Sequence, residues 1–264
     1  MKDFFKNVFA TVVGIFLFFV VMGLFCVMSI IGMVAAGEQT KSVKDNSVLV
    51  MNLSGIMEER AEDQPFSGLL GSSMGNAIGL DDVLSAIKKA KSNDKIKGIY
   101  IEAGAFAPDS YASMQAIRRE LNDFKKSGKW IVAYGDQYTQ NTYYLSSVAD
   151  QVWLNPIGMV DWHGLAAEPM LLKDVLAKFG VKMQLAKVGT YKSAPEQFTA
   201  DKMSDANREQ VTAYITGIWN KMVKDVAESR KISVEQLNTL ADNISAFDDP
   251  QNYVKQKLAD RLLY

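Results

Sequence analysis

IKGIYIEAGAFAPDSYASMQAIRRELNDFKKSGKWIVAY, residues 96–134, is the stretch that decides the fold. Two short apolar runs within it, Ile96–Glu102 and Trp130–Tyr134, have the length and composition of buried β-strands. The segment between them, Ser110–Ser127, has the periodicity of an amphipathic helix, and Gly128 follows as its C-terminal stop. Its apolar stripe consists of Met114, Ile117, Leu121 and Phe124. A strand, a helix and a strand in this order predict parallel strands joined by a right-handed crossover.

Strands and helices alternate over most of the remaining chain. Further strands are predicted at Ser47–Leu53, Gln151–Leu154 and Val181–Val188. Further helices are predicted at Asp81–Ala90, Asn141–Ser147, Leu171–Phe179, Asp205–Arg230, Val234–Ala241 and Pro250–Ala259. The Gly- and Ser-rich segment Ser67–Gly79 is predicted to be a mobile loop, and it lacks the Gly-Lys-Ser/Thr ending of a phosphate-binding loop. The pattern predicts an α/β fold with a parallel sheet, whose sites gather beyond the carboxyl ends of the strands.

The N-terminus predicts a membrane anchor. No charged residue occurs from Asn7 to Gly37, and this run exceeds the ~20 apolar residues that cross a bilayer. It is also longer than the apolar core of a cleavable signal peptide, so a retained anchor is favoured over cleavage at Ala35-Ala36. Lys2 and Lys6 precede the run and place the N-terminus in the cytoplasm. We expect one transmembrane helix within residues 1–37.

The part of the chain beyond the anchor is predicted to be a linker, residues 38–46, and one domain, residues 47–264. The net charge is −1 and no long basic run occurs, which argues against nucleic acid as a partner. The only cysteine, Cys26, lies in the anchor, so the domain can hold neither a disulfide nor a cysteine-based zinc site. The only histidine, His163, excludes a His-rich metal centre. We therefore expect no metal and no cofactor.

A lysine after the predicted strand Val181–Val188 is the first candidate for chemistry. It lies in Gly189-Thr190-Tyr191-Lys192-Ser193-Ala194, among small residues and one aromatic residue. A lysine held beyond a strand end can be partly desolvated, and desolvation favours the neutral amine that acts as a general base. A lysine after a strand is more commonly a solvated surface charge. The motif alone therefore leaves both interpretations open.

Five blocks of the chain carry a resemblance to a known family. They are Lys97–Ile101, Gly128–Gly135, Tyr143–Asp150, Gly158–Gly164 and Lys187–Glu196. In this order they resemble the signal peptide peptidase A family in its long, two-repeat form, which consists of membrane-anchored serine peptidases with a ClpP/crotonase-like fold. The last block is the most specific, because the family places its catalytic lysine in Thr-Tyr-Lys-Ser. The resemblance implies that Lys192 is the general base.

The same resemblance implies that a nucleophile is missing from this chain. Single-repeat members carry their catalytic serine just before a Gly-Gly-Tyr-Tyr run, and the aligned residue here is Gln140. In two-repeat members the second repeat supplies the serine. Because the sequence ends on the apolar residues Leu262–Tyr264 after a helical pattern, we expect it to be truncated before a second repeat. A loop is predicted at Ala103–Asp109, after the strand Ile96–Glu102, at the place where the family builds its oxyanion hole. This loop lacks a clear Gly-Gly pair, and we expect no working hole there.

Other candidate residues carry weaker signals. Ser85-Ala86-Ile87-Lys88 and Ser92-Asn93-Asp94-Lys95 match Ser-x-x-Lys, but the companion motifs of penicillin-binding enzymes are absent. His163 follows Asp161 by two residues. A structural histidine that bonds nearby backbone is favoured there over a catalytic one, because the resembling family works without a histidine.

Taken with the resemblance, the sequence predicts a membrane-bound serine endopeptidase with a Ser/Lys dyad that digests cleaved signal peptides. This chain supplies the lysine and is inactive alone. The expected location is the bacterial inner membrane, crossed once, with the domain on the periplasmic side. The expected partners are apolar peptides, the lipid bilayer and further copies of the chain, which contact one another through Trp219 and Met222 of the long helix. The alternative is a non-catalytic, membrane-anchored scaffold or peptide-binding module.

Overall fold

The computed structural model describes residues 1–37, 43–61, 77–243 and 245–264. These residues form two units, Met1–Lys44 and Asp45–Tyr264, which are described separately below. The predicted linker, residues 38–46, and the predicted loop Ser67–Gly79 lie largely outside the described residues, so both remain predictions.

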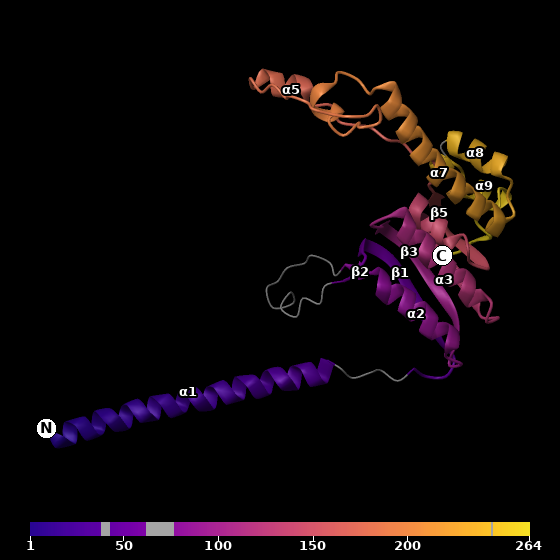
Figure 1. Cartoon of the computed structure of the whole chain (residues 1–264). Coiled ribbons are helices and arrows are strands. Elements are labelled where there is room, and N and C mark those ends of the chain that lie inside the picture. Colours follow the sequence, from indigo (N-terminus) through magenta and orange to yellow (C-terminus); the bar gives the residue numbers. More distant parts are fainter. Residues whose placement is uncertain (38–42, 62–76, 244) are drawn as a thin grey trace. The chain divides into compact units, whose positions relative to one another are not determined.

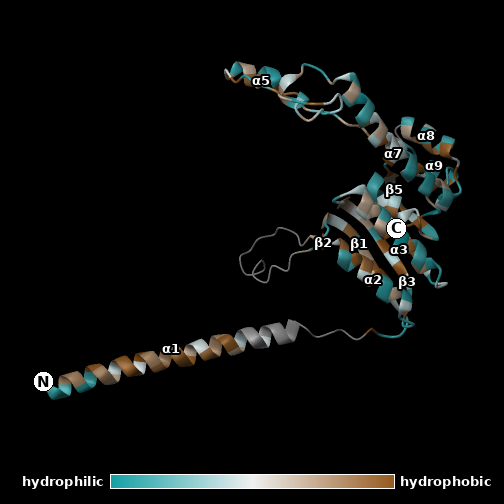
Figure 2. Ribbon diagram, viewed as in Figure 1, coloured by the Kyte–Doolittle hydropathy of each residue, from teal (hydrophilic) through white to brown (hydrophobic). Residues whose placement is uncertain are grey.

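The first unit is a single long helix. Helix α1 spans Lys2–Gly37, and an 18-residue window within Lys2–Ser29 has a mean hydropathy of 2.7 and no buried residue. Figure 2 shows hydrophobic residues along most of it. At ~1.5 Å per residue the helix is about 54 Å long, which exceeds the ~30 Å hydrocarbon core of a bilayer. By length and composition, α1 is long and apolar enough to be a membrane-spanning helix.

The second unit is built on a parallel six-stranded sheet in the order β2-β1-β3-β4-β5-β6. Its strands are β1 Ser47–Glu58, β2 Ile78–Gly79, β3 Ile96–Ala107, β4 Trp130–Tyr138, β5 Gln151–Val160 and β6 Arg261–Leu262. Every neighbouring pair is parallel, and the predicted pair β3 and β4 aligns Gly98 with Trp130 and Ala103 with Gly135. The α/β fold class with parallel strands is confirmed.

Helices cover the core face of this sheet. They are α2 Leu80–Ser92, α3 Tyr111–Lys125, α4 Gln140–Ser146, α7 Asp205–Arg230, α8 Val234–Asp242 and α9 Pro250–Lys255, with a 3₁₀ turn at Ser245–Phe247. Figure 1 shows α2 and α3 lying against the strands. The predicted stripe of α3 is fully buried, as are the inward-facing residues of the central strands: Ile99, Ile101, Ile131, Ala133, Val152 and Leu154. Burial of these apolar side chains is the main source of stability for the layer pair.

Residues 165–204 form an extension that we call the arm. It contains two short helices, α5 Lys173–Lys178 and α6 Glu196–Thr199. Figure 1 shows it continuing from the N-terminal end of α7, with α5 near its far end. Several large apolar side chains of the arm are exposed: Met170, Val175, Phe179, Val181, Met183, Leu185, Val188 and Tyr191. The arm therefore contributes little to the core of the domain.

The predicted strand Val181–Val188 was wrong. The structure assigns no strand to residues 181–188, and Val188 is 90% exposed. Apolar alternation produces a strand only where a neighbouring strand offers hydrogen-bond partners. In the described part of the chain, no strand pairs with this segment.

The predicted helix Pro250–Ala259 ends earlier than expected, and Arg261–Leu262 forms a strand that the sequence did not predict. Helix α9 stops at Lys255, and β6 pairs with Trp153 and Leu154 of β5. Asp260 holds this edge: it accepts hydrogen bonds from Arg230 Nη1 and Nη2 at 2.9 Å each and from Val152 N at 2.7 Å. A two-residue strand is too short for a periodic signal, which explains the error.

A carboxylate in the arm caps the beginning of α7. Glu196 is 6% exposed and accepts hydrogen bonds from Ser204 Oγ at 2.6 Å and from Ser204 N and Asn207 Nδ2 at 3.1 Å each. These bonds, the one from the Ser204 hydroxyl first, lower the pKa of Glu196. A negative charge at a helix N-terminus also interacts favourably with the helix dipole.

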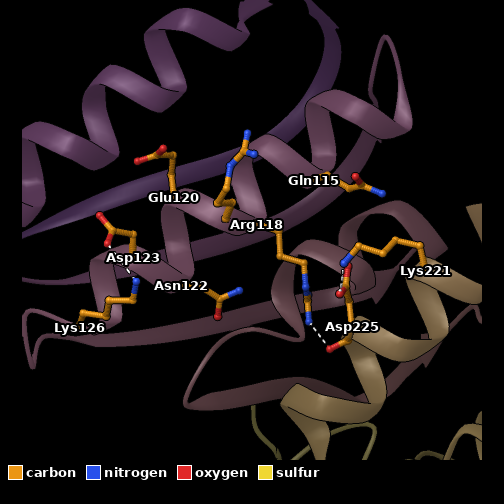
Figure 3. A pocket seen from close by; sticks show the side chains of 9 residues that line it. Gln115, Arg118, Glu120, Asn122, Asp123, Lys126, Lys221 and Asp225 are labelled. Carbon is orange, nitrogen blue, oxygen red and sulfur yellow. Dashed lines mark hydrogen bonds and ion pairs between the residues drawn. The ribbon is translucent and has the colours of Figure 1, made fainter.

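A buried arginine joins three helices. Arg118 of α3 is 3% exposed, and its guanidinium donates to Ser147 Oγ at 2.8 Å, Asp225 O at 2.7 Å and Ser229 Oγ at 2.6 Å, as well as to Tyr144 O. Figure 3 shows its side chain directed toward Asp225 on α7, at a groove of about 560 Å³ between α3 and α7. Burial lowers the pKa of Arg118. Each donated bond ties α3 to α4 or α7.

We expect Arg118→Met to lower the free energy of unfolding by about 3 to 5 kcal/mol, because it removes the four hydrogen bonds of the buried guanidinium that join α3 to the end of α4 and to α7. Urea denaturation of the second unit, Asp45–Tyr264, measures this. Arg119→Met is the matched control, since Arg119 is the exposed neighbour on the same helix, and we expect a change within about 0.5 kcal/mol. Equal losses in the two variants would contradict the assigned role of Arg118.

We expect the stabilisation by Glu196 to depend on pH in one direction. Because its folded-state pKa is lowered, its contribution is fully present above the unfolded-state value of about 4.3 and is lost as pH falls through the folded-state value. The urea midpoint of the wild type minus that of Glu196→Gln should therefore be largest near pH 6 and shrink in acid. A difference that stays constant down to pH 3 would refute this.

Candidate active site

Lys192 lies in the arm, in a series of tight turns between Gly189 and α6. Gly189 has φ +100°, a backbone conformation that favours glycine, which explains the glycine of this motif. Lys192 N donates to Gly189 O at 3.5 Å, and Glu196 N donates to Ser193 O at 2.9 Å. The Lys192 side chain is exposed, so this chain alone does not desolvate it.

A cavity of about 580 Å³ lies beside Lys192. Its lining consists of Ala186, Lys187, Val188, Tyr191, Lys192, Ser193, Ala194 and Pro195. Helix α7 holds this segment: Tyr191 donates its hydroxyl to Glu209 Oε2 at 3.0 Å, and Gln210 Nε2 donates to Ser193 Oγ at 3.5 Å. The Glu209 carboxylate raises the pKa of Tyr191. The candidate general base thus lies at the edge of a hollow in which four of the eight lining residues are small and apolar.

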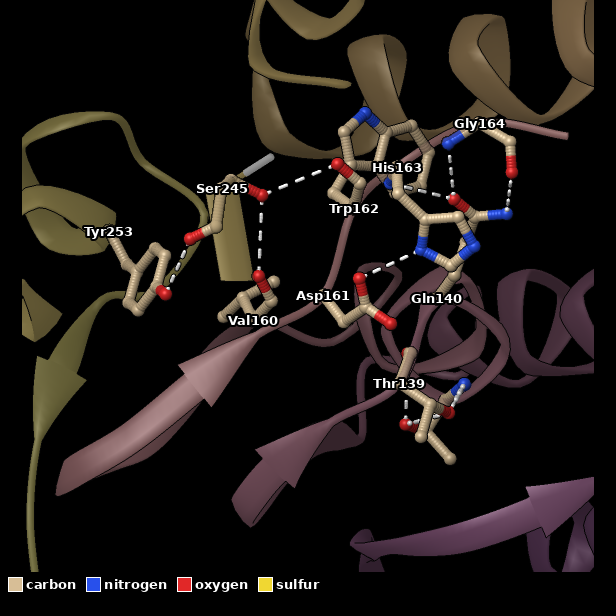
Figure 4. A network of polar contacts seen from close by, with 10 residues as sticks. Thr139, Gln140, Val160, Asp161, Trp162, His163, Gly164, Ser245 and Tyr253 are labelled. Carbon is tan, nitrogen blue, oxygen red and sulfur yellow. Dashed lines mark hydrogen bonds and ion pairs between the residues drawn. The ribbon is translucent and has the colours of Figure 1, made fainter. Parts of the chain in front are cut away.

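The residue aligned with a nucleophile is fully engaged in hydrogen bonds. Gln140 follows the N-cap Thr139 at the start of α4, just beyond the carboxyl end of β4. It is 5% exposed, and its Oε1 accepts from His163 N at 3.0 Å and Gly164 N at 2.9 Å. Its Nε2 donates to Gly164 O at 2.9 Å (Figure 4). A carboxamide has no nucleophilic hydroxyl, so Gln140 cannot attack a peptide carbonyl.

His163 contacts a carboxylate rather than the backbone that the sequence predicted. Its Nδ1 lies 2.7 Å from Asp161 Oδ1, and its side chain is 53% exposed (Figure 4). It lines a cavity of about 240 Å³ together with Trp219, Asn238 and others. Among the described residues, no group of three or more His, Cys, Asp or Glu side chains could hold a metal ion.

The segment expected to mark the oxyanion-hole position is mostly strand. Residues 103–107 continue β3, where Phe106 pairs with Gly55 and Ala107 with Ile56 of β1. Successive amides of a strand point to opposite sides, whereas an oxyanion hole needs donors that converge on one atom. The prediction of a loop beginning at Ala103 was therefore wrong.

These features stay apart in the chain. In the part that the structure describes, no hydrogen bond and no common cavity joins Lys192 to Gln140 or His163. Of the two residues that we expected at a contact between copies, Met222 is buried in the core, whereas Trp219 is only partly buried. Met222 is 1% exposed, and Trp219 packs on Trp162 with ring centroids 4.9 Å apart. A helix with apolar residues at core spacing does not reveal which of them remain exposed.

Comparison with known proteins places these residues in a family. Residues 123–264 match peptidase family S49. Two relatives named Protease 4, from Haemophilus influenzae and Salmonella typhi, are 32% and 35% identical over 228 and 229 residues; both alignments cover 84% of this chain and 36% of the relative. A relative named Serine protease SPPA, chloroplastic, from Arabidopsis thaliana is 27% identical over 187 residues, 71% of this chain and 26% of the relative.

The chain thus spans no more than 36% of the length of these curated relatives. The region matched by the family contains both Gln140 and Lys192. It also contains β5, β6 and the helices between them, which frame the arm. On the match over 123–264, which is more than half of the sequence, the chain belongs to peptidase family S49.

Proposed function

We propose that this chain is part of a membrane-bound serine endopeptidase in which Lys192 is the general base. The observation that carries the proposal is the Gly-Thr-Tyr-Lys-Ser segment, held beside an apolar-lined cavity in a chain of family S49. The long apolar helix α1 supports a membrane anchor. The names of the relatives, Protease 4 and serine protease, support the reaction class.

The serine must come from outside the aligned position, because Gln140 stands there. In the proposed reaction a serine oxygen bonds to the peptide carbonyl carbon while its proton passes to neutral Lys192 Nζ. The lysine returns this proton to the leaving amine as the carbon–nitrogen bond breaks. Water, deprotonated by the same lysine, then releases the acyl group and restores the serine. A second repeat that covers Lys192 supplies both the serine and the desolvation.

The proposed substrates are the apolar remnants of cleaved signal peptides. The cavity beside Lys192 is suited to bind apolar side chains of a substrate, because its lining includes the small apolar residues Val188, Ala194 and Pro195. An anchor that places the N-terminus in the cytoplasm puts the domain on the periplasmic side of the bacterial inner membrane. There it meets peptides that remain in the membrane after cleavage.

We also propose that the chain assembles with a second copy or repeat through the arm. The support is its set of exposed apolar side chains, of which Phe179 is 80% and Val188 is 90% exposed. Such side chains favour burial against a partner. The alternative function, a non-catalytic scaffold or peptide-binding module, is favoured by one observation: Gln140 is built into a fully satisfied network.

We expect Lys192→Ala and Lys192→Arg to reduce kcat of the complete protein at least ~100-fold, because general acid–base catalysis is worth about 10² to 10⁴ and a guanidinium stays protonated. Hydrolysis of a fluorogenic apolar peptide measures this. Lys182→Ala, an exposed lysine of the arm outside the cavity, is the control. Turnover like the wild type by either Lys192 variant would remove this lysine from the mechanism.

We expect residues 40–264, freed of the anchor, to form oligomers or aggregates in sedimentation. Phe179→Ser combined with Val188→Ser should shift them toward monomer, since these side chains are the most exposed apolar groups of the arm. Phe247→Ser is the control, because Phe247 is 87% exposed but lies outside the arm. A stable wild-type monomer, or an equal response to the control, would contradict assembly through the arm.

A further inference from the structure

We propose that Gln140 is a positioning residue whose carboxamide fastens the root of the arm and thereby positions Lys192. The kinetic part of this inference rests on the proposed function, whereas its structural part does not. The root consists of His163 and Gly164, where the chain passes from β5 into the arm.

Both polar groups of the Gln140 carboxamide form hydrogen bonds with the backbone of His163 and Gly164. Its oxygen accepts from two successive backbone amides, His163 N at 3.0 Å and Gly164 N at 2.9 Å, and its nitrogen donates to Gly164 O at 2.9 Å (Figure 4). Gly164 has φ +90°, a backbone conformation that glycine adopts more readily than other residues. Both polar groups of the Gln140 side chain thus restrain Gly164, the residue of the root with the greatest backbone freedom.

Other contacts hold the residues just before His163 in place. Trp162 is fully buried and donates its Nε1 to Leu237 O at 3.0 Å, and Ser245 Oγ lies 3.3 Å from both Val160 O and Trp162 O. After Gly164, the next main-chain hydrogen bond along the described arm joins Leu172 N to Gln197 O at 2.6 Å. Gln140 therefore marks the boundary between the fixed body and the arm.

The arm has a second root in α7, which begins after Glu196 and Ser204 and returns to the body. Trp219 of α7 packs on Trp162, two residues before Gly164, so both roots meet at one point of the body. A segment restrained at two adjacent roots has a defined direction, whereas one restrained at a single root can pivot. Loss of the Gln140 bonds should therefore displace Lys192 without unfolding the domain.

Two substitutions, each with a side chain similar in volume to glutamine, remove different numbers of the three Gln140 hydrogen bonds. Gln140→Met removes all of them, and Gln140→Glu keeps the acceptor oxygens but loses the donor to Gly164 O. The matched control is Lys129→Met, because Lys129 Nζ also makes three bonds to backbone, with Ala90 O, Lys91 O and Asn93 O at 2.8, 3.0 and 2.8 Å. That control loosens the end of α2 and not the arm.

The first measurement is hydrogen exchange of the His163 and Gly164 amides in the 264-residue chain, corrected for global stability. We expect Gln140→Met to speed exchange at least ~10-fold, Gln140→Glu to have a smaller effect, and Lys129→Met to have none. The second measurement is kcat and KM of the complete protein at a temperature where every variant is folded. We expect Gln140→Met to lower kcat at least ~10-fold with little change in KM, because a misplaced base slows chemistry.

Each outcome decides a separate point. Unchanged exchange in Gln140→Met overturns the fastening of the root. Faster exchange with a kcat no lower than that of Lys129→Met overturns the positioning role. If Lys192→Ala keeps full activity while exchange still rises in Gln140→Met, the proposed function fails and the structural part of the inference stands. Faster exchange together with a selective loss of kcat supports both.

Discussion

The buried guanidinium of Arg118 needs hydrogen-bond acceptors, and this need determines how the helices of this domain pack. A guanidinium removed from water is costly unless its donors are satisfied. Arg118 meets this demand with carbonyl and hydroxyl oxygens of α4 and α7, elements that are distant from α3 in sequence. The ring of Tyr144, 4.8 Å from the guanidinium carbon, adds a cation–π contact. Apolar burial alone tolerates many helix arrangements, whereas these directional bonds select one. The position of α7, and with it the inner end of the arm, follows from that selection.

Local periodicity made the central part of the fold predictable. The stripe of α3 and the apolar runs of β3 and β4 depend on residues close in sequence. The stripe is buried as expected, and so is one face of each strand, whereas Trp130 on the other face of β4 is 41% exposed. Arg118 also had a signal, because it stands four residues after Met114 and three before Leu121, at the edge of that stripe. The two strand errors have the opposite origin. Whether residues 181–188 or 261–262 form strands depends on partners far away in the sequence, which periodicity does not report.

The candidate site divides in the same way. The motif around Lys192 was recognisable from neighbouring residues, and Gly189 has the positive φ that its place in the motif suggests. The role of Gln140 was not recognisable, because its three partners lie 23 and 24 residues further along the chain. The cap formed by Glu196 was equally hidden, although a carboxylate shortly before a long helix is a known capping pattern. A site read from sequence therefore located the reactive group but not the contacts that hold it.

The pairing of β6 with β5 has a consequence for how the chain folds during synthesis. The two strands are separated by about a hundred residues, so their contact closes a long loop that includes the whole arm. On the ribosome, β1 to β5 and their helices emerge first, and the outer edge of β5 remains open until Arg261 leaves the exit tunnel. During that interval the strand edge and the exposed apolar side chains of the arm are both open to non-native contacts. The bonds that Asp260 accepts from Arg230 and Val152 hold β6 against β5 and thereby cover this edge.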